Sequence, residues 1–130
     1  MLPAEYSVKR VSDSEAQVEF RLDPGMVYFK GHFPGRPVLP GVAQLGLACG
    51  LCEEIFKTTV PFREVPQAKF LKPMQPSDEI VLDLSYDRSS GQADFAYYIK
   101  AAQAPDCTLS QGKAPEGYTL ASRGRLRTAG

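Results

Sequence analysis

The chain has 130 residues, 43% of them hydrophobic, which suits one domain with a single packed core. Fifteen acidic and fifteen basic side chains cancel, so the overall charge gives no reason to expect a nucleic acid or an anionic membrane as a partner. The polar N-terminus lacks the apolar core of a signal peptide, and no apolar run has membrane-spanning length. We therefore expect a cytoplasmic protein.

The first half of the chain predicts two strands, a loop and a helix. Alternating apolar and polar residues predict strands at 6–11 and 16–22. The segment that follows, up to residue 41, is too rich in proline and glycine to be one regular element. Apolar residues then recur at three- and four-residue spacing, which predicts a helix at about 42–57. Because its first three turns carry no charge, we expect protein to cover most of its circumference.

The second half predicts strands. Alternating patterns favour strands at 67–72, 79–86, 92–102 and 108–114. One long buried helix among many antiparallel strands predicts an α+β fold. We expect a single domain over 1–114. The arginine-containing segment 115–130 has little apolar content, so it is expected to be a C-terminal tail of uncertain order.

His32 is the only histidine of the chain, and it lies between two glycines, Gly31 and Gly35, in the string GHFPG. Histidine is the residue type whose unperturbed pKa suits proton transfer near neutral pH. The flanking glycines leave the imidazole accessible. The alternative for a lone loop histidine is a solvated side chain without a catalytic role.

Gly41 marks the expected start of the helix. Backbone N–H groups at a helix N-terminus lack intrahelical acceptors, and the helix dipole favours negative charge there. A thioester carbonyl against this N–H would be polarised, and an enolate-like transition state would be stabilised. The alternative is that the Pro40-Gly41 pair only starts the helix and lets it pack closely. Both interpretations can hold together.

The string FKGHFPGRPVLPGV resembles the signature of the 3-hydroxyacyl-[acyl carrier protein] dehydratases, and AKFLKPMQPSDEIVLDL is similar to a second stretch of that family. The resemblance extends from about residue 26 to 114. The short N-terminus also resembles the dehydratase-like proteins of aryl polyene and related lipid gene clusters. The resemblance implies a hot-dog fold, in which a bent antiparallel sheet wraps around one central helix, and a dimer with the substrate tunnel between subunits.

The resemblance also implies roles for residues. His32 is the base that removes the C2 proton of a 3-hydroxyacyl thioester, and Gly41 is the oxyanion donor. The substrate is expected to contact the loop and the first turns of the helix, at Phe33, Pro34, Gly35, Val38, Pro40, Val42, Gly46 and Gly50. An acidic carrier protein, or the phosphate of its prosthetic group, is expected to meet Lys30, Arg36, Lys69 and Lys72. An ordinary solvated surface is the alternative for these four.

The sequence departs from the family at one position. The family carries Glu or Asp five residues after the glycine of the PG turn, on the partner subunit's helix, to handle the leaving hydroxyl; here that position is Gly46. Three explanations are open: His32 performs both proton transfers with a bound water, the substrate needs no second carboxyl, or the chain is a weakened subunit. The alternative functions are a hot-dog thioesterase and a non-catalytic acyl-binding or accessory subunit that pairs with a homologue.

Gly46 and Gly50 lie four residues apart on one face of the helix, where each costs about 1 kcal/mol of helix propensity relative to alanine. Close packing of the sheet or of a partner helix is one explanation, and space for an acyl chain is another. Cys49 and Cys52 match a CxxC pattern, but the chain has one histidine and no second CxxC, so we expect reduced packing residues and no zinc site. No other metal or cofactor motif is present.

Overall fold

The computed structural model describes residues 3, 5–23, 38–105 and 115–128. It contains one helix and six strands: β1 (Ser7–Arg10), β2 (Glu15–Arg21), α1 (Gly41–Phe56), β3 (Phe62–Phe70), β4 (Glu79–Asp87), β5 (Gln92–Lys100) and β6 (Tyr118–Thr128). The segments 24–37 and 106–114 lie outside the described residues, and so does the strand predicted at 108–114.

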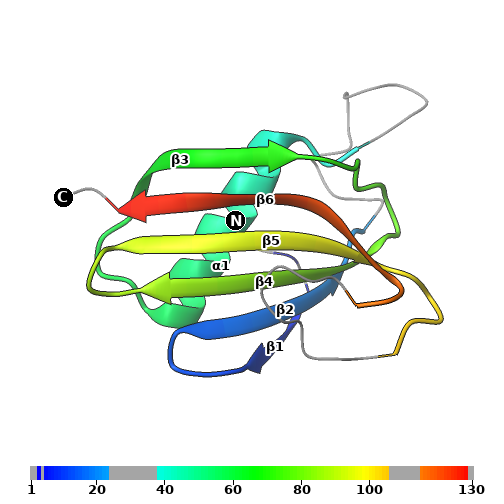
Figure 1. Ribbon diagram of the computed structural model, residues 1–130, viewed down its shortest axis with the longest axis horizontal. Helices are drawn as coiled ribbons and strands as arrows, with labels where there is room; N and C mark the ends of the chain where they lie inside the picture. The colour runs from blue at the N-terminus through cyan, green and yellow to red at the C-terminus, as the bar shows by residue number, and fades with distance from the viewer. Residues whose placement is uncertain (1–2, 4, 24–37, 106–114, 129–130) are drawn as a thin grey trace.

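The six strands form one open antiparallel sheet in the order β1-β2-β4-β5-β6-β3, and α1 crosses one face of it (Figure 1). Successive side chains along the strands point to opposite faces of the sheet, and the two faces differ in their surroundings. Along β4, Ile80, Leu82 and Leu84 join the core under the helix, whereas Val81 joins a small apolar cluster on the other, outer face. One helix against a sheet of six antiparallel strands confirms the predicted α+β class.

The core lies between α1 and the sheet. The helix contributes Leu47, Leu51 and Phe56, each with no exposed surface. Burial of a side chain of this size contributes about 1.5–3 kcal/mol, so this one face can hold the helix on the sheet.

Most of the circumference of α1 is buried or half-buried, as expected, but one narrow face opposite the sheet is open in the described chain. Val42 is 78% exposed, Gly46 is exposed, and Leu45 and Cys49 are only partly buried. These four residues are called the open face of α1 below. The physical reason is that the described chain forms one sheet on one side of the helix.

The tail predicted at 115–130 instead contains β6, which pairs with β5 on one side and with β3 on the other. Two features hid this strand. A register irregularity between Tyr97 and Tyr98 breaks the alternation of the pair, and three arginines replace the apolar residues typical of a central strand. Arg125 pairs with Asp94 and Arg127 pairs with Glu64.

The other predicted elements are found within a few residues of their expected bounds. The largest difference is β3, which was expected at 67–72 but begins at Phe62. This edge strand contains Pro66 and two register shifts against β6, which obscure the alternating pattern. Edge strands and bulges are the positions where a sheet tolerates proline.

Candidate active site at the start of helix α1

The helix begins without a side-chain cap. Pro40 occupies the N-cap position with extended backbone angles, φ −63° and ψ 152°, and the first turn contains no acidic residue. The backbone N–H groups of Ala43 and Gln44 both donate to the Pro40 carbonyl at 3.0 Å. Gly41 precedes these donors, and an N–H at this position has no intrahelical acceptor. The first turn therefore offers a backbone donor and the positive end of the helix dipole to a ligand.

The residues just before the helix are held by the β3–β4 connection. Leu39 is buried, and its N–H donates to the carbonyl of Met74 at 2.8 Å. Val38 and Pro40, two of the predicted substrate residues, are half-buried on either side of it. The end of the predicted active-site loop is thus fixed to the body of the domain.

Phe70, which the sequence analysis did not include in the site, packs on Gly41. A Cβ added to Gly41 would meet the Phe70 ring at 3.0–3.4 Å, so a side chain there would require the ring to shift by a few tenths of an ångström. The ring remains 52% exposed. The only signal in the sequence was the position of Phe70 within the AKFLKP segment, which gives no information about contact with Gly41.

A buried amide also went unrecognised. Gln44 is 4% exposed, and its side chain bonds both the Leu39 carbonyl and the Ser122 hydroxyl. The signal that could have found it is a lone polar residue in the apolar first turns of the helix.

Gly46 lies on the open face of α1. A Cβ added there would find nothing within 4 Å in the described chain, so the sheet does not pack against this position. Val42 is on the same face, one turn earlier, and Gly50 is one turn later and half-buried. Close packing of the sheet on a bare backbone is therefore wrong for Gly46, whereas packing of a partner helix there stays a prediction, as does space for an acyl chain.

Two of the four predicted carrier-binding residues are described. Lys69 lies on β3 and Lys72 follows it; both are exposed. Lys69 is the register partner of Arg123 on β6, so two cations stand directly opposite each other. Like charges in this relation destabilise a sheet, which makes Arg123 a further residue of interest. The other predicted site residues lie outside the described residues: Lys30, His32, Phe33, Pro34, Gly35 and Arg36.

The CxxC cysteines are packing residues in the structure. Cys52 has no exposed surface, and burial raises the pKa of its thiol, with the neighbouring Cys49 and Glu53 adding to the effect. Burial also raises the pKa of the Cys49 thiol. Neither is thus activated as a thiolate. Among the described residues, no group of three or more His, Cys, Asp or Glu side chains could hold a metal ion.

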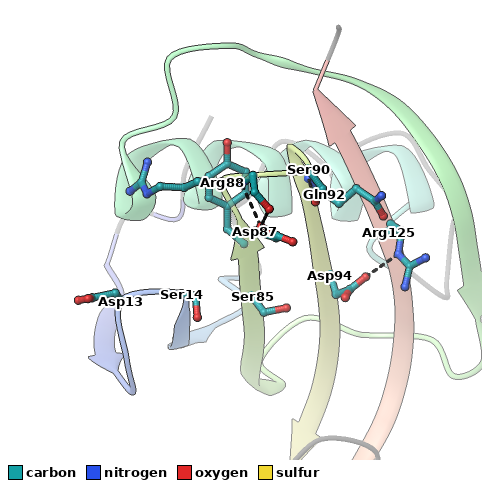
Figure 2. Close-up of a pocket in the computed structure, with 11 residues that line it drawn as sticks. Asp13, Ser14, Ser85, Asp87, Arg88, Ser90, Gln92, Asp94 and Arg125 are labelled. Carbon is teal, nitrogen blue, oxygen red and sulfur yellow. Dashed lines mark hydrogen bonds and ion pairs between the residues drawn. The ribbon is translucent and has the colours of Figure 1, made fainter.

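An open pocket of about 660 Å³ lies elsewhere, on the sheet beside the β4–β5 turn (Figure 2). Its two cations are already engaged. Arg125 Nε donates to Asp94 Oδ1 at 2.9 Å, and Arg88 Nη2 donates to the Phe56 carbonyl at the C-terminal end of α1. The pocket is therefore at the opposite end of the helix from Gly41.

No helix in the described part of the chain is long and apolar enough to cross a membrane.

Comparison with solved structures supports the hot-dog fold. A chain of the dehydratase heterocomplex ApeI:P from Xenorhabdus doucetiae is 28% identical, with a TM-score of 0.76, over 98% of this chain and 97% of that one. The dehydratase domain of the polyketide protein PpsC from Mycobacterium tuberculosis has a TM-score of 0.68 over 89% of this chain and 40% of that one, at 16% identity. The second likeness concerns the fold alone.

Curated dehydratase sequences are also similar to this chain. The 3-hydroxyacyl-[acyl-carrier-protein] dehydratase FabZ of Paracidovorax citrulli is 36% identical over 74 residues, which are 49% of this chain and 51% of the relative. The chain thus spans about half the length of this relative. The profile of the ApeI-like family, described as ApeI dehydratase, matches residues 8–113. The chain therefore belongs to the ApeI-like dehydratase family.

Proposed function

We propose that this chain takes part in the dehydration of 3-hydroxyacyl thioesters carried on acyl carrier protein, or in the reverse hydration, in fatty acid or polyene biosynthesis. The observation that carries the proposal is the start of α1 at Gly41 without a side-chain cap, which residues 36–40 separate from the GHFPG motif in the sequence. His32 removes the C2 proton, and the Gly41 N–H stabilises the negative charge that develops on the thioester oxygen. The C3–O bond then breaks, and the hydroxyl leaves as water after it gains a proton.

Gly46 has no side chain that could donate this last proton, although it stands where the family carries Glu or Asp. A homodimer does not solve the problem, because symmetry places a second Gly46 on the partner. A homologous subunit with Glu or Asp at this position would supply the missing group. The open face of α1 and the similarity to a chain of the ApeI:P heterocomplex support this arrangement.

We propose that the second subunit covers the open face of α1. Val42 is 78% exposed beside the partly buried Leu45, and burial of such apolar surface favours association. The substrate's acyl chain would then lie between the subunits beside Gly46 and Gly50. A homodimer is the alternative assembly. In that case His32 and a bound water would perform both proton transfers.

Carrier-protein recognition is part of the same proposal. Lys69, Lys72 and Arg123 are exposed cations, and the first and last stand opposite each other on β3 and β6. An acidic partner would relieve their mutual repulsion. Lys30 and Arg36 are proposed to extend this surface. A cytoplasmic location goes with a carrier-protein substrate.

The test is conversion of a 3-hydroxyacyl-carrier-protein substrate to the enoyl product, followed by mass spectrometry, with free acid monitored in the same samples. The proteins are the wild type, His32→Ala and Gly46→Glu, each alone and with a homologous subunit that carries the helix carboxylate. We expect enoyl product from the wild type together with the homologous subunit, with a loss of about 10²–10⁴-fold when His32→Ala replaces the wild type.

The arms of this assay distinguish the alternative functions. Activity only with the added subunit assigns the carboxylate to the partner, and activity gained by Gly46→Glu alone assigns the defect to that position. Release of free acid without enoyl product would establish the thioesterase alternative. No product under any condition would leave a non-catalytic acyl-binding subunit and contradict the proposal.

A further arm of this assay compares carrier-bound with pantetheine-bound substrate. Lys69→Glu and Arg123→Glu should raise KM for the carrier-bound substrate and leave the pantetheine-bound one unaffected. Lys57→Glu, an exposed lysine at the far end of α1, is the matched control. Equal effects on both substrates would contradict a carrier-binding role.

A further inference from the structure

Three buried polar side chains meet at the first turn of α1. The amide nitrogen of Gln44 donates to the Leu39 carbonyl at 3.0 Å, and the amide oxygen accepts from the Ser122 hydroxyl at 2.6 Å. The Tyr97 hydroxyl donates to the backbone carbonyl of Gln44, also at 2.6 Å. Ser122 and Tyr97 have no exposed surface.

These bonds join three separate segments to one residue of the helix. Gln44 connects α1 to β5 through Tyr97, to β6 through Ser122, and to the segment before the helix through Leu39. Loss of one partner would leave another polar group buried and unsatisfied, which is costly in the low dielectric of the core. The network therefore fixes the position of the first turn more strictly than apolar packing alone.

Gly41 lies in the sequence between Leu39 and Gln44, two residues that a bond of this network joins. The ring that packs on Gly41 belongs to Phe70, which is the register partner of Ser122 in the β3–β6 pair. Both the backbone of Gly41 and the ring against it are thus attached to the same buried cluster.

We propose that Gln44, Ser122 and Tyr97 are positioning residues that hold the Gly41 N–H at the angle required of an oxyanion donor. This inference rests on the proposed function, because it assigns the network a task in that reaction. A donor contributes to catalysis only when it is aimed in advance at the atom where charge develops. The residues act through Gly41 and do not touch the substrate.

The experiment compares deletions of single polar groups at matched burial. Ser122→Ala and Tyr97→Phe each remove one hydroxyl from the network, and Gln44→Met removes the amide at nearly constant volume. Tyr118→Phe is the control, because its hydroxyl donates to the Pro105 carbonyl at 2.9 Å on the outer face of the sheet. All four deletions are expected to lower Tm.

Catalysis should separate the network from the control. We expect Ser122→Ala and Gln44→Met to lower kcat by about 10–100-fold with KM within about twofold of the wild type, since a misplacement of about 1 Å can cost 10²-fold. Tyr118→Phe should leave kcat unchanged. Ser122→Ala and Tyr97→Phe remain informative if Gln44→Met fails to fold, because they change little volume.

A second readout does not depend on turnover. The chain has eleven glycines, so a protein labelled with ¹⁵N-glycine gives few resonances, and Gly41 can be assigned from its loss in Gly41→Ala. We expect the Gly41 order parameter to fall from about 0.85 toward 0.6 in the network variants but not in Tyr118→Phe.

The two readouts distinguish the possible failures. Variants that lower Tm but leave both kcat and the Gly41 order parameter at wild-type values would overturn the inference. A wild type without dehydratase activity, with the order parameter still reduced in the variants, would contradict the proposed function and retain the positioning role.

Discussion

The two ends of α1 are built in opposite ways. At the C-terminal end, Arg10 Nη1 donates to the Ile55 carbonyl at 2.9 Å, and Arg88 Nη2 donates to the Phe56 carbonyl. The Arg10 guanidinium also lies over the Phe56 ring, 5.3 Å from its centroid. Two cations thus satisfy the negative end of the helix dipole.

At the N-terminal end, no side chain among the described residues performs the equivalent task. Pro40 provides no side-chain cap, and the first turn has no acidic residue. A cap at this position typically contributes about 1 kcal/mol, so its absence has a cost. The two ends of α1 therefore differ: side chains complete the C-terminal end, whereas none of the described side chains caps the start, where we propose that the substrate binds.

Among changes at the two ends of α1, the largest expected effect comes from removal of the Gly41 N–H itself. Gly41→Pro deletes this donor, and proline suits the first helical position after an extended residue such as Pro40. We expect kcat to fall about 10²–10³-fold, the usual cost of losing one oxyanion donor.

Gly41→Ala is the matched variant, because it adds a Cβ against the same Phe70 ring and keeps the N–H. The measurement is kcat and KM of both variants on the same 3-hydroxyacyl thioester. Equal losses in the two variants would mean that the contact with Phe70, and not the donor, explains the effect.

The start of α1 was predictable from sequence because its signals are local. The change from proline and glycine to helical spacing marks the start of α1 at Gly41, and the loop motif identifies the region. The remaining parts of the site could not be predicted in this way. Phe70 and Ser122 reach Gly41 and Gln44 from β3 and β6, and such contacts depend on the order and register of the strands.

The C-terminal end of α1 shows the same limit. The sequence near Ile55 and Phe56 does not predict which side chains bind their carbonyls. The donors, Arg10 and Arg88, come from β1 and from the β4–β5 turn. β6 was overlooked for a related reason. In the sequence, its arginines are typical of a polar tail. In the structure, two of them pair with Asp94 and Glu64 on the neighbouring strands.

A smaller effect is expected from the C-terminal caps. Arg10→Met and Arg88→Met remove the cations but keep part of the apolar stem, and each should lower the free energy of unfolding by about 1 kcal/mol. Because these residues are at the end of α1 away from Gly41, kcat should not change. Thermal unfolding and kinetics on the same samples test both statements.

Arg21→Met is the control for these substitutions. Arg21 is exposed on β2 and donates to the Ser77 hydroxyl at 3.2 Å, without contact to a helix carbonyl. Its loss should change stability by less than either cap. A fall in kcat in the cap variants would show that the two ends of α1 are coupled, and the comparison between them would then be wrong.

The smallest expected effect is a change of stability with pH. It determines the pH range in which variants of the two ends of α1 are best compared. Burial on the outer face of the sheet, together with the charge of Glu15, raises the pKa of Asp83 to about 6. Its unfolded value is about 3.9, so between these two values the folded state keeps a proton that the unfolded state releases. Stability should therefore decrease as pH rises from about 4 to about 6, and this contribution should be constant above that window.

Asp83→Asn isolates this contribution because asparagine has a similar shape and no charge. At pH 7 the variant should be more stable than the wild type by about 1 kcal/mol, after a discount for the partial solvent exposure of the carboxyl. Below pH 4 the difference should disappear. Urea unfolding of both proteins from pH 4 to pH 8 measures it, and a constant difference across that range would contradict the raised pKa. Above pH 6 the contribution of Asp83 to stability is constant. The stabilities of the cap variants and of the Gly41 variants should therefore be compared above this pH.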